Sequence, residues 1–211
     1  MVFSEEESTI NFLIATGNAH KKKEFERILS PLGITIMTPK EAGIEFPDVE
    51  ETGTTFEENA IIKAECGCKI SGMPTLSDDS GLCVDALNGA PGIYSARYSS
   101  DTDENADDIS NNNKLLKELS DTPLEKRTAY YVCAVACVFP DGRKLVVRGE
   151  CHGKIGIEPK GNGGFGYDPL FIVGDGDKTF GELSPEEKDL QSHRSVALHK
   201  MYEILKSEGN S

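Results

Sequence analysis

One long β-hairpin constrains the fold of this chain more than any other feature of its sequence. Residues 128–139 are rich in β-forming residues, Pro140-Asp141-Gly142 is a turn sequence, and residues 144–147 resume an extended pattern. A hairpin joins antiparallel strands. Any sheet that contains these residues therefore includes at least one antiparallel pair.

The N-terminal part predicts a different connection, a strand followed by a helix. Residues 10–16 (INFLIAT) form an apolar run that stops at Gly17-Asn18, which is typical of a buried strand. Residues 21–32 carry apolar side chains at helical spacing, and Gly33 provides the stop. Together with the hairpin, this alternation predicts the α/β class with a mixed sheet.

Capping residues and periodicity predict the remaining elements. They are a strand at 34–37, a helix from Thr54 or Thr55 to about Ile70, a turn at 78–81 followed by an extended segment at 82–84, an exposed loop at 99–113 entering a short helix at 114–119, a strand at 170–173, a helix that begins after Ser184, and a final helix opened by Ser192-His193-Arg194.

The charge balance limits the classes of partner. Among 211 residues, 22 are basic and 36 acidic, so the formal net charge is −14. This charge argues against binding to nucleic acid but leaves room for a small anionic ligand. No apolar run is long enough to span a membrane, and the N-terminus lacks the pattern of a signal peptide. We therefore expect no membrane association and a cytoplasmic location.

The six cysteines show no spacing typical of a zinc site. There is no Cys-x-x-Cys pair and no matching pair of histidines. In a reducing compartment we expect most of them to be small, buried thiols.

The turn between the first strand and the first helix is a candidate anion site. Thr16-Gly17-Asn18 would place backbone N–H groups at a helix N-terminus, with Lys21 in the first turn. An ordinary strand-to-helix turn beside solvated lysines is the alternative. The segment is not a Walker A loop, because it lacks the glycine spacing and the Lys-Ser/Thr pair.

Two acidic segments could share a metal ion. Asp78-Asp79-Ser80-Gly81 is predicted to place two carboxylates at a strand end, of which one enters a cleft, and Glu50-Glu51-Thr52-Gly53 is a second acidic turn. One carboxylate from each would suit Mg²⁺, which takes one or two carboxylates plus phosphate oxygens. Turn capping and solvated acidic faces are the alternatives.

A glycine-rich segment, residues 161–166, contains the letters of a dinucleotide-binding motif. A strand follows it rather than a helix, so the dinucleotide interpretation is rejected. Phe165 among four glycines could present its ring to a planar ligand, with Asp168 at the edge; a core Phe in a tight loop is the alternative. Farther on, Lys188, His193 and Arg194 could donate to a base or a phosphate, or form a surface charge patch.

Together these segments resemble the inosine triphosphate pyrophosphatase family. The matching blocks occur in the family's order and cover residues 10 to about 205: TGNxxK from Thr16, EETG from Glu50, FxENA from Phe56, DDSGLxVDAL from Asp78, GAPGIYSARY from Gly89, GFGYDP from Gly164, and SHR from Ser192.

The resemblance implies the fold and the reaction. We expect an elongated α/β domain over residues 10–208, with a mixed β-sheet, flanking helices, two lobes and a nucleotide cleft between them; residues 1–9 would be a variable extension. The family hydrolyses dITP, ITP and XTP or dXTP to the monophosphate and pyrophosphate with Mg²⁺. This activity keeps deaminated purines out of DNA and RNA. A homodimer is implied as well.

The resemblance also assigns roles by position. Asp79 would be the general base and a metal ligand, and Glu51 would help to hold the metal. The phosphate path would be lined by Thr16, Gly17, Asn18, Lys21, Lys63 and Ser80. Phe165 would stack on the base, which Gly166, Tyr167 and Asp168 would frame and Lys188, His193 and Arg194 would read.

Two alternatives remain at this point. One is a related pyrophosphatase of pyrimidine or modified nucleotides, similar to the septum-formation inhibitor proteins. The other is a nucleotide sensor without turnover, for which Glu51 and Asp79 would be unnecessary. Donors at Arg194 and His193 favour purines with a 6-oxo group over adenine.

Overall fold

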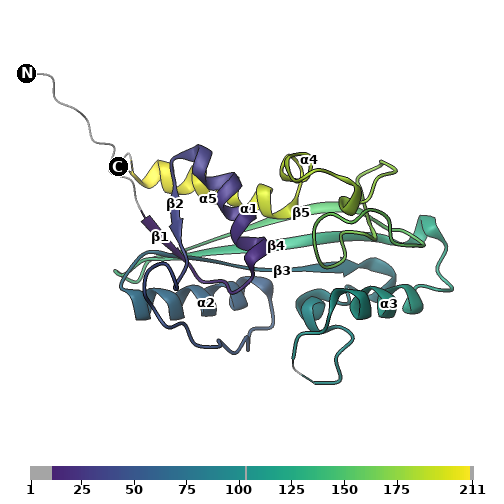
Figure 1. The fold of residues 1–211 in the computed structure, drawn as a ribbon, viewed down its shortest axis with the longest axis horizontal. Coiled ribbons are helices and arrows are strands. Elements are labelled where there is room, and N and C mark those ends of the chain that lie inside the picture. The colour runs from purple at the N-terminus through teal and green to yellow at the C-terminus, as the bar shows by residue number, and fades with distance from the viewer. Residues whose placement is uncertain (1–10, 103, 210–211) are drawn as a thin grey trace, which may run out of the picture.

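The computed structural model of the chain describes residues 11–102 and 104–209, which form a mixed sheet flanked by helices (Figure 1). The strand order is β2-β1-β3-β4-β5-β6. The strands are β1 (Asn11–Ile14), β2 (Thr35–Met37), β3 (Thr75–Val84), β4 (Thr128–Val138), β5 (Lys144–Ile155) and β6 (Phe171–Val173). β1 is parallel to β2 and β3, whereas β3 to β6 are antiparallel. The predicted α/β class and mixed sheet are confirmed.

Three long strands give the molecule its elongated shape. β4 and β5 pair over their whole length, from Thr128 opposite Lys154 to Val138 opposite Lys144, so the hairpin is longer than its sequence signal predicts. β3 pairs with β4 from Thr75 to Val84. These strands run through both lobes of the structure (Figure 1).

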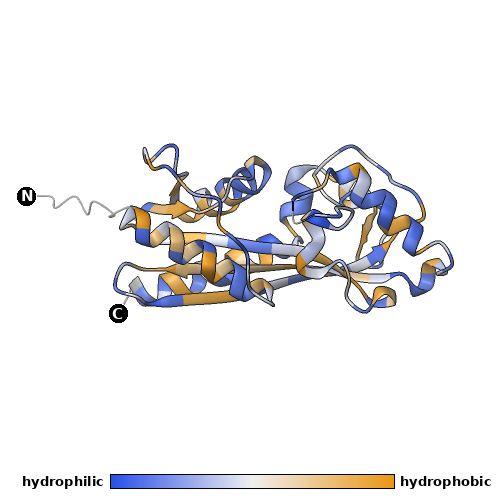
Figure 2. Ribbon diagram, turned by 90° about the horizontal axis from the view of Figure 1, so that it is seen from below, coloured by the Kyte–Doolittle hydropathy of each residue, from blue (hydrophilic) through white to orange (hydrophobic). Residues whose placement is uncertain are grey.

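Helices cover both faces of the sheet. In one lobe, α1 (Ala19–Leu29) and α5 (His193–Gly209) lie on one face and α2 (Phe56–Ser71) lies on the other (Figure 1). The second lobe contains α3 (Asp108–Glu118), β6 and the segment that leads to α4 (Pro185–Asp189). Along these helices, hydrophobic residues alternate with hydrophilic ones (Figure 2).

The core has three parts that follow this division. One cluster lies between the sheet and α1 and α5, and includes Phe25, Leu76 and Leu198. A second lies between the sheet and α2. The third fills the other lobe, where Phe171 and Phe180 pack on Leu115 and its neighbours. Each face of the sheet is thus buried separately.

Caps set the helix boundaries where the sequence predicts them. Thr55 is the N-cap of α2, and its hydroxyl accepts from the Glu58 N–H; Gly72, with a φ of 67°, ends the helix. The Glu58 carboxylate accepts from the Thr54 N–H at 2.7 Å. Ser184 and Glu187 form a capping box at α4. At α2, Thr54 and Thr55 therefore both contribute to the start of the helix.

The predicted turn at residues 78–81 is wrong. These residues lie inside β3, because their partners on β4 continue without interruption from Val135 to Val132. Gly81 allows the close approach of a neighbouring segment, since a Cβ there would collide with the Gly92 carbonyl oxygen. A glycine in a strand can mark close backbone packing rather than a turn.

The loop predicted for residues 99–113 ends earlier than expected. α3 begins at Asp108, and the Asp107 carboxylate caps it by accepting from the Ser110 N–H at 2.9 Å. Asn111 is buried inside the helix, where its side-chain carboxamide oxygen accepts from the Ser99 N–H. The polar composition of this stretch therefore reflects capping and buried hydrogen bonds as well as exposure.

All six cysteines are free thiols, and five of them are buried. Within the described ranges, none of the helices combines the length and the apolar character that crossing a membrane requires.

A candidate nucleotide cleft between the two lobes

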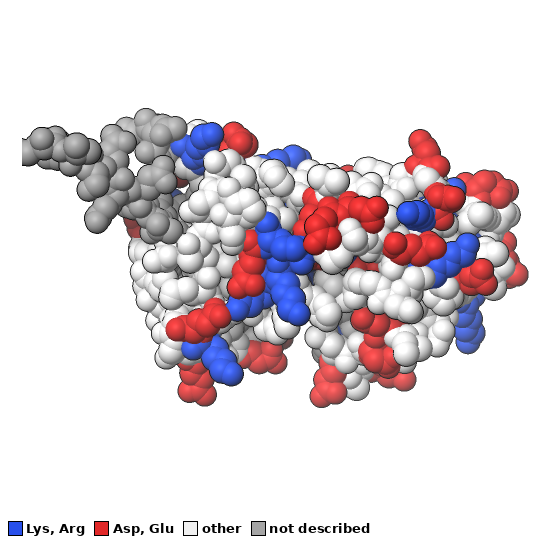
Figure 3. Space-filling view, turned by 45° about the horizontal axis from the view of Figure 1, so that its top comes forward, with Lys and Arg blue, Asp and Glu red and all other residues white. Residues whose placement is uncertain are grey.

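The candidate site lies where β3 extends beyond β1. β1 pairs with β3 only at Thr75 and Leu76, and the chain then leaves the sheet through Thr16. A cleft of about 430 Å³ opens beside the rest of β3 and is lined by residues of both lobes. Lys and Arg gather beside the notch between the lobes, whereas Asp and Glu are spread over much of this face (Figure 3).

The turn after β1 forms one wall of this cleft. The Asn18 carboxamide oxygen caps α1 by accepting from the N–H groups of His20 at 2.9 Å and Lys21 at 3.1 Å. The Thr16 hydroxyl accepts from the Asn18 N–H at 3.2 Å. Thr16, Asn18 and Lys21 line the cleft, whereas Gly17 shapes the turn and does not line it. The predicted strand-to-helix turn is therefore beside the site.

A carboxylate pair around a single ammonium group forms another wall. Lys63 on α2 places its Nζ 2.7 Å from Glu51 Oε1 and 3.4 Å from Asp79 Oδ1. The second oxygen of Asp79 accepts from the Asn59 carboxamide at 3.2 Å. Glu51 and Asp79, predicted to share a metal, thus converge on one cation.

Burial and neighbouring charges shift the pKa values of Asp79 and Lys63. It raises the pKa of Asp79, and the Glu51 charge raises it further, although Lys63 and Lys21 oppose both effects. Burial alone would lower the pKa of Lys63, but the charges of Asp79 and Glu51 outweigh it, so the pKa of Lys63 is raised. Lys63 is therefore an ammonium at neutral pH.

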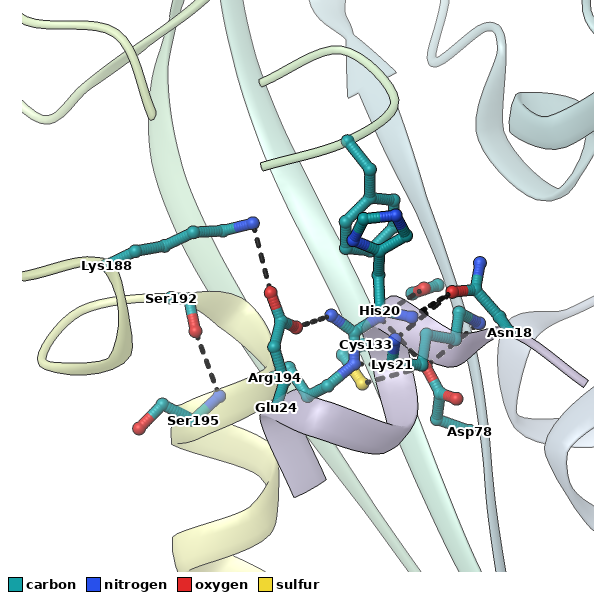
Figure 4. A network of polar contacts seen from close by, with 12 residues as sticks. Asn18, His20, Lys21, Glu24, Asp78, Cys133, Lys188, Ser192, Arg194 and Ser195 are labelled. Carbon is teal, nitrogen blue, oxygen red and sulfur yellow. Dashed lines mark hydrogen bonds and ion pairs between the residues drawn. The ribbon is translucent and has the colours of Figure 1, made fainter. Parts of the chain in front are cut away.

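Asp78 belongs to a different network on the opposite face of β3. Its Oδ2 lies 3.0 Å from both the Lys21 Nζ and the Arg194 Nη2 (Figure 4). Glu24 accepts from Arg194 and from Lys188, the latter at 3.2 Å. Burial opposes ionisation of Asp78, but the three cations Lys21, Arg194 and Lys63 together hold its pKa below its usual range.

Phe165 also lines the cleft. Its N–H donates to Asp168 Oδ2 at 2.9 Å, and Lys188 Nζ binds the same oxygen at 2.6 Å. The Lys188 Nζ is also 5.0 Å from the Phe165 ring centre. Asp168 thus fixes both the loop and the lysine. Burial raises the pKa of Asp168, against the effect of Lys188.

The other members of the predicted base-binding segment have distinct contacts. The Tyr167 hydroxyl donates to the Ser95 carbonyl oxygen at 2.8 Å, and the Gly166 N–H donates to Asp108 Oδ2 at 2.7 Å. Both residues line the cleft. Tyr167 therefore connects the segment to the wall of the second lobe.

His193 and Arg194 enter the cleft from the start of α5. Gly149 on β5 allows this approach, since a Cβ there would collide with the His193 carbonyl oxygen. The His193 ring stacks on Tyr131 with centroids 4.6 Å apart, and its Nδ1 is buried without a partner. Burial, and then the charges of Arg194 and Lys188, lower the pKa of His193 well below its usual value. The imidazole is neutral at pH 7.

Arg194 is more committed to protein partners than its predicted role implies. Its guanidinium donates to Asp78, to Glu24 and, at 2.9 Å, to the Ser80 hydroxyl. Four of its five N–H donors are thereby used. It still lines the cleft, with Cζ 5.8 Å from the Phe165 ring centre.

The structure brings every predicted site residue except Gly17 to the cleft lining, and it adds residues that sequence patterns did not single out. Glu24 links Lys188 to Arg194, and Asn59 orients Asp79. Arg97 also lines the cleft, and its Nε is buried without a partner. Glu24 carried a weak signal, because it is a carboxylate among the buried positions of α1.

Comparison with known proteins shows the family of this chain. The model of the Ham1 family matches residues 12–204. A dITP/XTP pyrophosphatase of Geobacter sulfurreducens is 48% identical over 197 residues, which cover 93% of this chain and 97% of the relative. A dITP/XTP pyrophosphatase of Bacillus subtilis is 47% identical over 195 residues, covering 92% and 96%.

Solved structures agree with the sequence relatives. A HAM1 protein from Coxiella burnetii superposes with a TM-score of 0.83 at 39% identity, covering 94% of this chain and 100% of that chain. The Ham1 protein of Staphylococcus aureus gives a TM-score of 0.80 at 41% identity, covering 94% and 99%. These matches confirm the family resemblance drawn from the sequence motifs and the elongated α/β fold. The chain belongs to the Ham1 family.

Proposed function

We propose that the chain hydrolyses dITP, ITP and XTP or dXTP to the nucleoside monophosphate and pyrophosphate. Relatives at 47–48% identity are dITP/XTP pyrophosphatases. One observation of the structure carries the proposal most directly. A single cleft holds an aromatic ring, Phe165, together with two carboxylates that converge on a cation, Glu51 and Asp79 around Lys63.

The Glu51–Asp79 pair fits a divalent metal. Carboxylate oxygens are the ligands that Mg²⁺ prefers, and the pair already surrounds one positive charge, the Lys63 ammonium. We therefore assign Glu51 and Asp79 as the residues that would hold Mg²⁺. The ion would neutralise charge on the phosphate chain and polarise the phosphorus under attack. No cluster of three or more metal-ligating side chains occurs among residues 11–102 and 104–209, so substrate oxygens would complete the coordination.

The remaining residues on this side hold the phosphate chain. Lys21 and Lys63 supply positive charge, and the start of α1, with its positive helix-dipole end, lies beside Thr16 and Asn18 in the same cleft. Gly17 would bring the backbone of the turn close to the chain, and the Ser80 hydroxyl would contribute from β3. Charge neutralisation and alignment of the attacking water are the main requirements of phosphoryl chemistry.

Asp79 is the group suited to act as general base. Its raised pKa makes its carboxylate a better proton acceptor than an ordinary aspartate, and Asn59 fixes its orientation. In this role it orients a water toward the α-phosphorus and takes the proton as the bond to the pyrophosphate breaks. Lys63 stays charged throughout and stabilises the leaving group.

The other side of the cleft would select the base. Phe165 stacks on the purine, while Gly166, Tyr167 and Asp168 frame it. Lys188, the neutral His193 and the remaining N–H of Arg194 supply donors to a 6-oxo group. Adenine presents an amino donor at that position, so its binding would leave donors unpaired at a cost of about 1–3 kcal/mol per buried group.

The test is pyrophosphate release with Mg²⁺ from ITP, XTP, GTP and ATP in parallel, at one sub-saturating concentration. Fast release from ITP and XTP with little from GTP and ATP supports both the activity and the base pocket. Equal release from all four contradicts the base-selecting roles of Lys188, His193 and Arg194. No release from any contradicts the proposed function and favours a pyrimidine enzyme or a sensor.

Four further proposals concern assembly, domain extent and location, and of these the homodimer and the domain bounds come from the resemblance. The chain would be a homodimer, which light scattering after gel filtration tests, and would not bind nucleic acid, in agreement with its net charge of −14. Residues 10–208 would form one domain, so deletion of residues 1–9 would leave turnover unchanged. A cytoplasmic location agrees with six free thiols and is tested by cell fractionation.

A further inference from the structure

His20 and Phe165 join the two walls of the cleft through an aromatic stack. Their ring centroids are 5.3 Å apart, with an angle of 29° between the ring planes. His20 belongs to the first turn of α1, and Figure 4 shows its ring above the Lys21–Asp78 ion pair. Phe165 belongs to the glycine-rich segment of the other lobe. The stack therefore connects the first turn of α1 to the glycine-rich segment.

Apart from His20, the Phe165 ring is approached by two cations, the Lys188 ammonium at 5.0 Å and the Arg194 guanidinium at 5.8 Å from its centre, and it has little apolar support. It is half-buried and belongs to none of the three hydrophobic clusters of the described residues. Gly164 and Gly166, with φ angles of 73° and 63°, flank it. Asp168 holds its backbone N–H, but that bond leaves the side chain free to rotate. Within the described parts of the chain, His20 is the one aromatic residue paired with this ring.

His20 is itself attached to the turn that would bind phosphate. Its N–H donates to the Asn18 carboxamide, the same oxygen that accepts from the Lys21 N–H. Phe165, Asn18 and Lys21 line the cleft, whereas His20 does not. The imidazole therefore supports, from outside the cleft lining, a ring that itself lines the cleft.

We propose that His20 is a positioning residue, which holds the Phe165 ring for the purine base and couples that ring to the phosphate-binding turn. The proposal rests on the stacking role given to Phe165 in the proposed function. Phosphate oxygens bound at Asn18 and Lys21 fix the first turn of α1. That turn fixes His20, and His20 fixes the ring on which the base stacks.

The test compares three variants by steady-state kinetics with ITP. His20→Ala removes the stack, and we expect KM to rise about two- to twelvefold, the range for one aromatic pair, while kcat stays near that of the wild type. His20→Phe restores a flat ring and restores KM. His152→Ala is the matched control, because His152 stacks on Tyr130 at 5.4 Å and the same 29°, away from the cleft lining. Its KM stays unchanged.

Other outcomes would overturn the proposal. A lower KM in His20→Ala means that the imidazole blocks the base rather than supporting the ring. An unchanged KM, or no recovery in His20→Phe, means that the stack does not position Phe165.

A second measurement separates this proposal from the proposed function. If the wild-type chain does not release pyrophosphate from ITP, the proposed function fails, and titration with inosine monophosphate then replaces KM. Weaker binding of inosine monophosphate by His20→Ala, with recovery in His20→Phe, still supports the positioning role. Equal binding by the wild type, His20→Ala and His20→Phe overturns it. The His20 ring-proton NMR signal reports the stack directly. Its displacement by the Phe165 ring current must disappear in Phe165→Leu.

Discussion

Asp78 and Asp79 are adjacent in β3, yet their carboxylates lie on opposite faces of the sheet. Asp78 binds Lys21 and Arg194 on the α1–α5 side, each at 3.0 Å. Asp79 binds Lys63 at 3.4 Å and Asn59 at 3.2 Å on the α2 side. The alternation of side chains along a strand produces this division.

The two carboxylates differ in their availability for chemistry. Asp78 does not line the cleft, and three neighbouring cations hold its pKa below the usual range. Asp79 lines the cleft, and burial raises its pKa. The alternation of side chains in β3 therefore leaves Asp78 to hold Lys21 and Arg194 in place and Asp79 available for the reaction.

Asp79→Asn is expected to abolish most turnover without loss of the fold. The amide keeps the shape and can still accept from Asn59, but it cannot take a proton, so kcat should fall about 10²- to 10⁴-fold. Pyrophosphate release and a thermal unfolding curve measure the two effects. Asp141→Asn, in the exposed hairpin turn, is the control. Turnover near the wild-type rate would remove Asp79 from the role of base.

Phe165→Ala is expected to weaken substrate binding more than catalysis. Stacking of one base on an aromatic side chain contributes about 1–3 kcal/mol, so KM for ITP should rise about five- to 150-fold with a smaller change in kcat. Phe139→Ala, beside the hairpin turn and outside the cleft lining, is the control. Equal losses in kcat and in 1/KM would contradict a stacking role.

Local sequence patterns predicted most elements of the fold. The hairpin, the cap of α2 and the turn after β1 each depend on residues close together in the chain, so their signals are local. The acidic segment at Asp78 was assigned to a turn because Asp, Ser and Gly are common in turns. In the structure, pairing with β4 outweighs that preference and keeps the segment extended. Because β4 is distant in the sequence, no local pattern reports this pairing.

The buried charge network could not be predicted from sequence patterns. Arg194 lies 170 residues from Glu24 and 116 from Asp78, so no spacing relates them. The resemblance assigns Arg194 to reading the base, but carboxylates bind most of its donors. The family resemblance identified Arg194 and Lys188 as site residues without showing that Glu24 holds both.

His193 makes the stability of the protein depend on pH near neutrality. Its pKa is well below 6.5 in the folded chain, so the unfolded chain binds the proton more tightly. Folding free energy is therefore lost as the pH falls below 6.5, by up to about 1.4 kcal/mol per pH unit. Between pH 7.5 and 5.5 this residue should cost the wild type about 1.4 kcal/mol in the free energy of unfolding.

Urea unfolding of His193→Phe at both pH values measures this contribution. Phenylalanine keeps a ring against Tyr131 and does not titrate, so the variant should lose less stability than the wild type over the same range. His152→Phe, at an exposed position, should follow the wild type. Parallel pH curves for His193→Phe and the wild type would show that His193 is not buried as a neutral ring.

Asp78→Asn is expected to destabilise the fold strongly at pH 7. The change leaves Arg194 and Lys21 without a buried counter-charge, and breaking such a pair by removing one partner costs about 3–5 kcal/mol.

Because the folded chain holds the pKa of Asp78 below its ordinary value of 3.8, its stabilising charge is present above that pH and is lost as the pH falls further. The difference in the free energy of unfolding between Asp78→Asn and the wild type should therefore become smaller in acid. Urea unfolding at pH 7 and near pH 3 checks both statements, with Asp141→Asn expected to change stability far less because its ion pair with Arg143 is exposed. A cost at Asp78 as small as that at Asp141 would show that water, rather than the two cations, solvates this carboxylate.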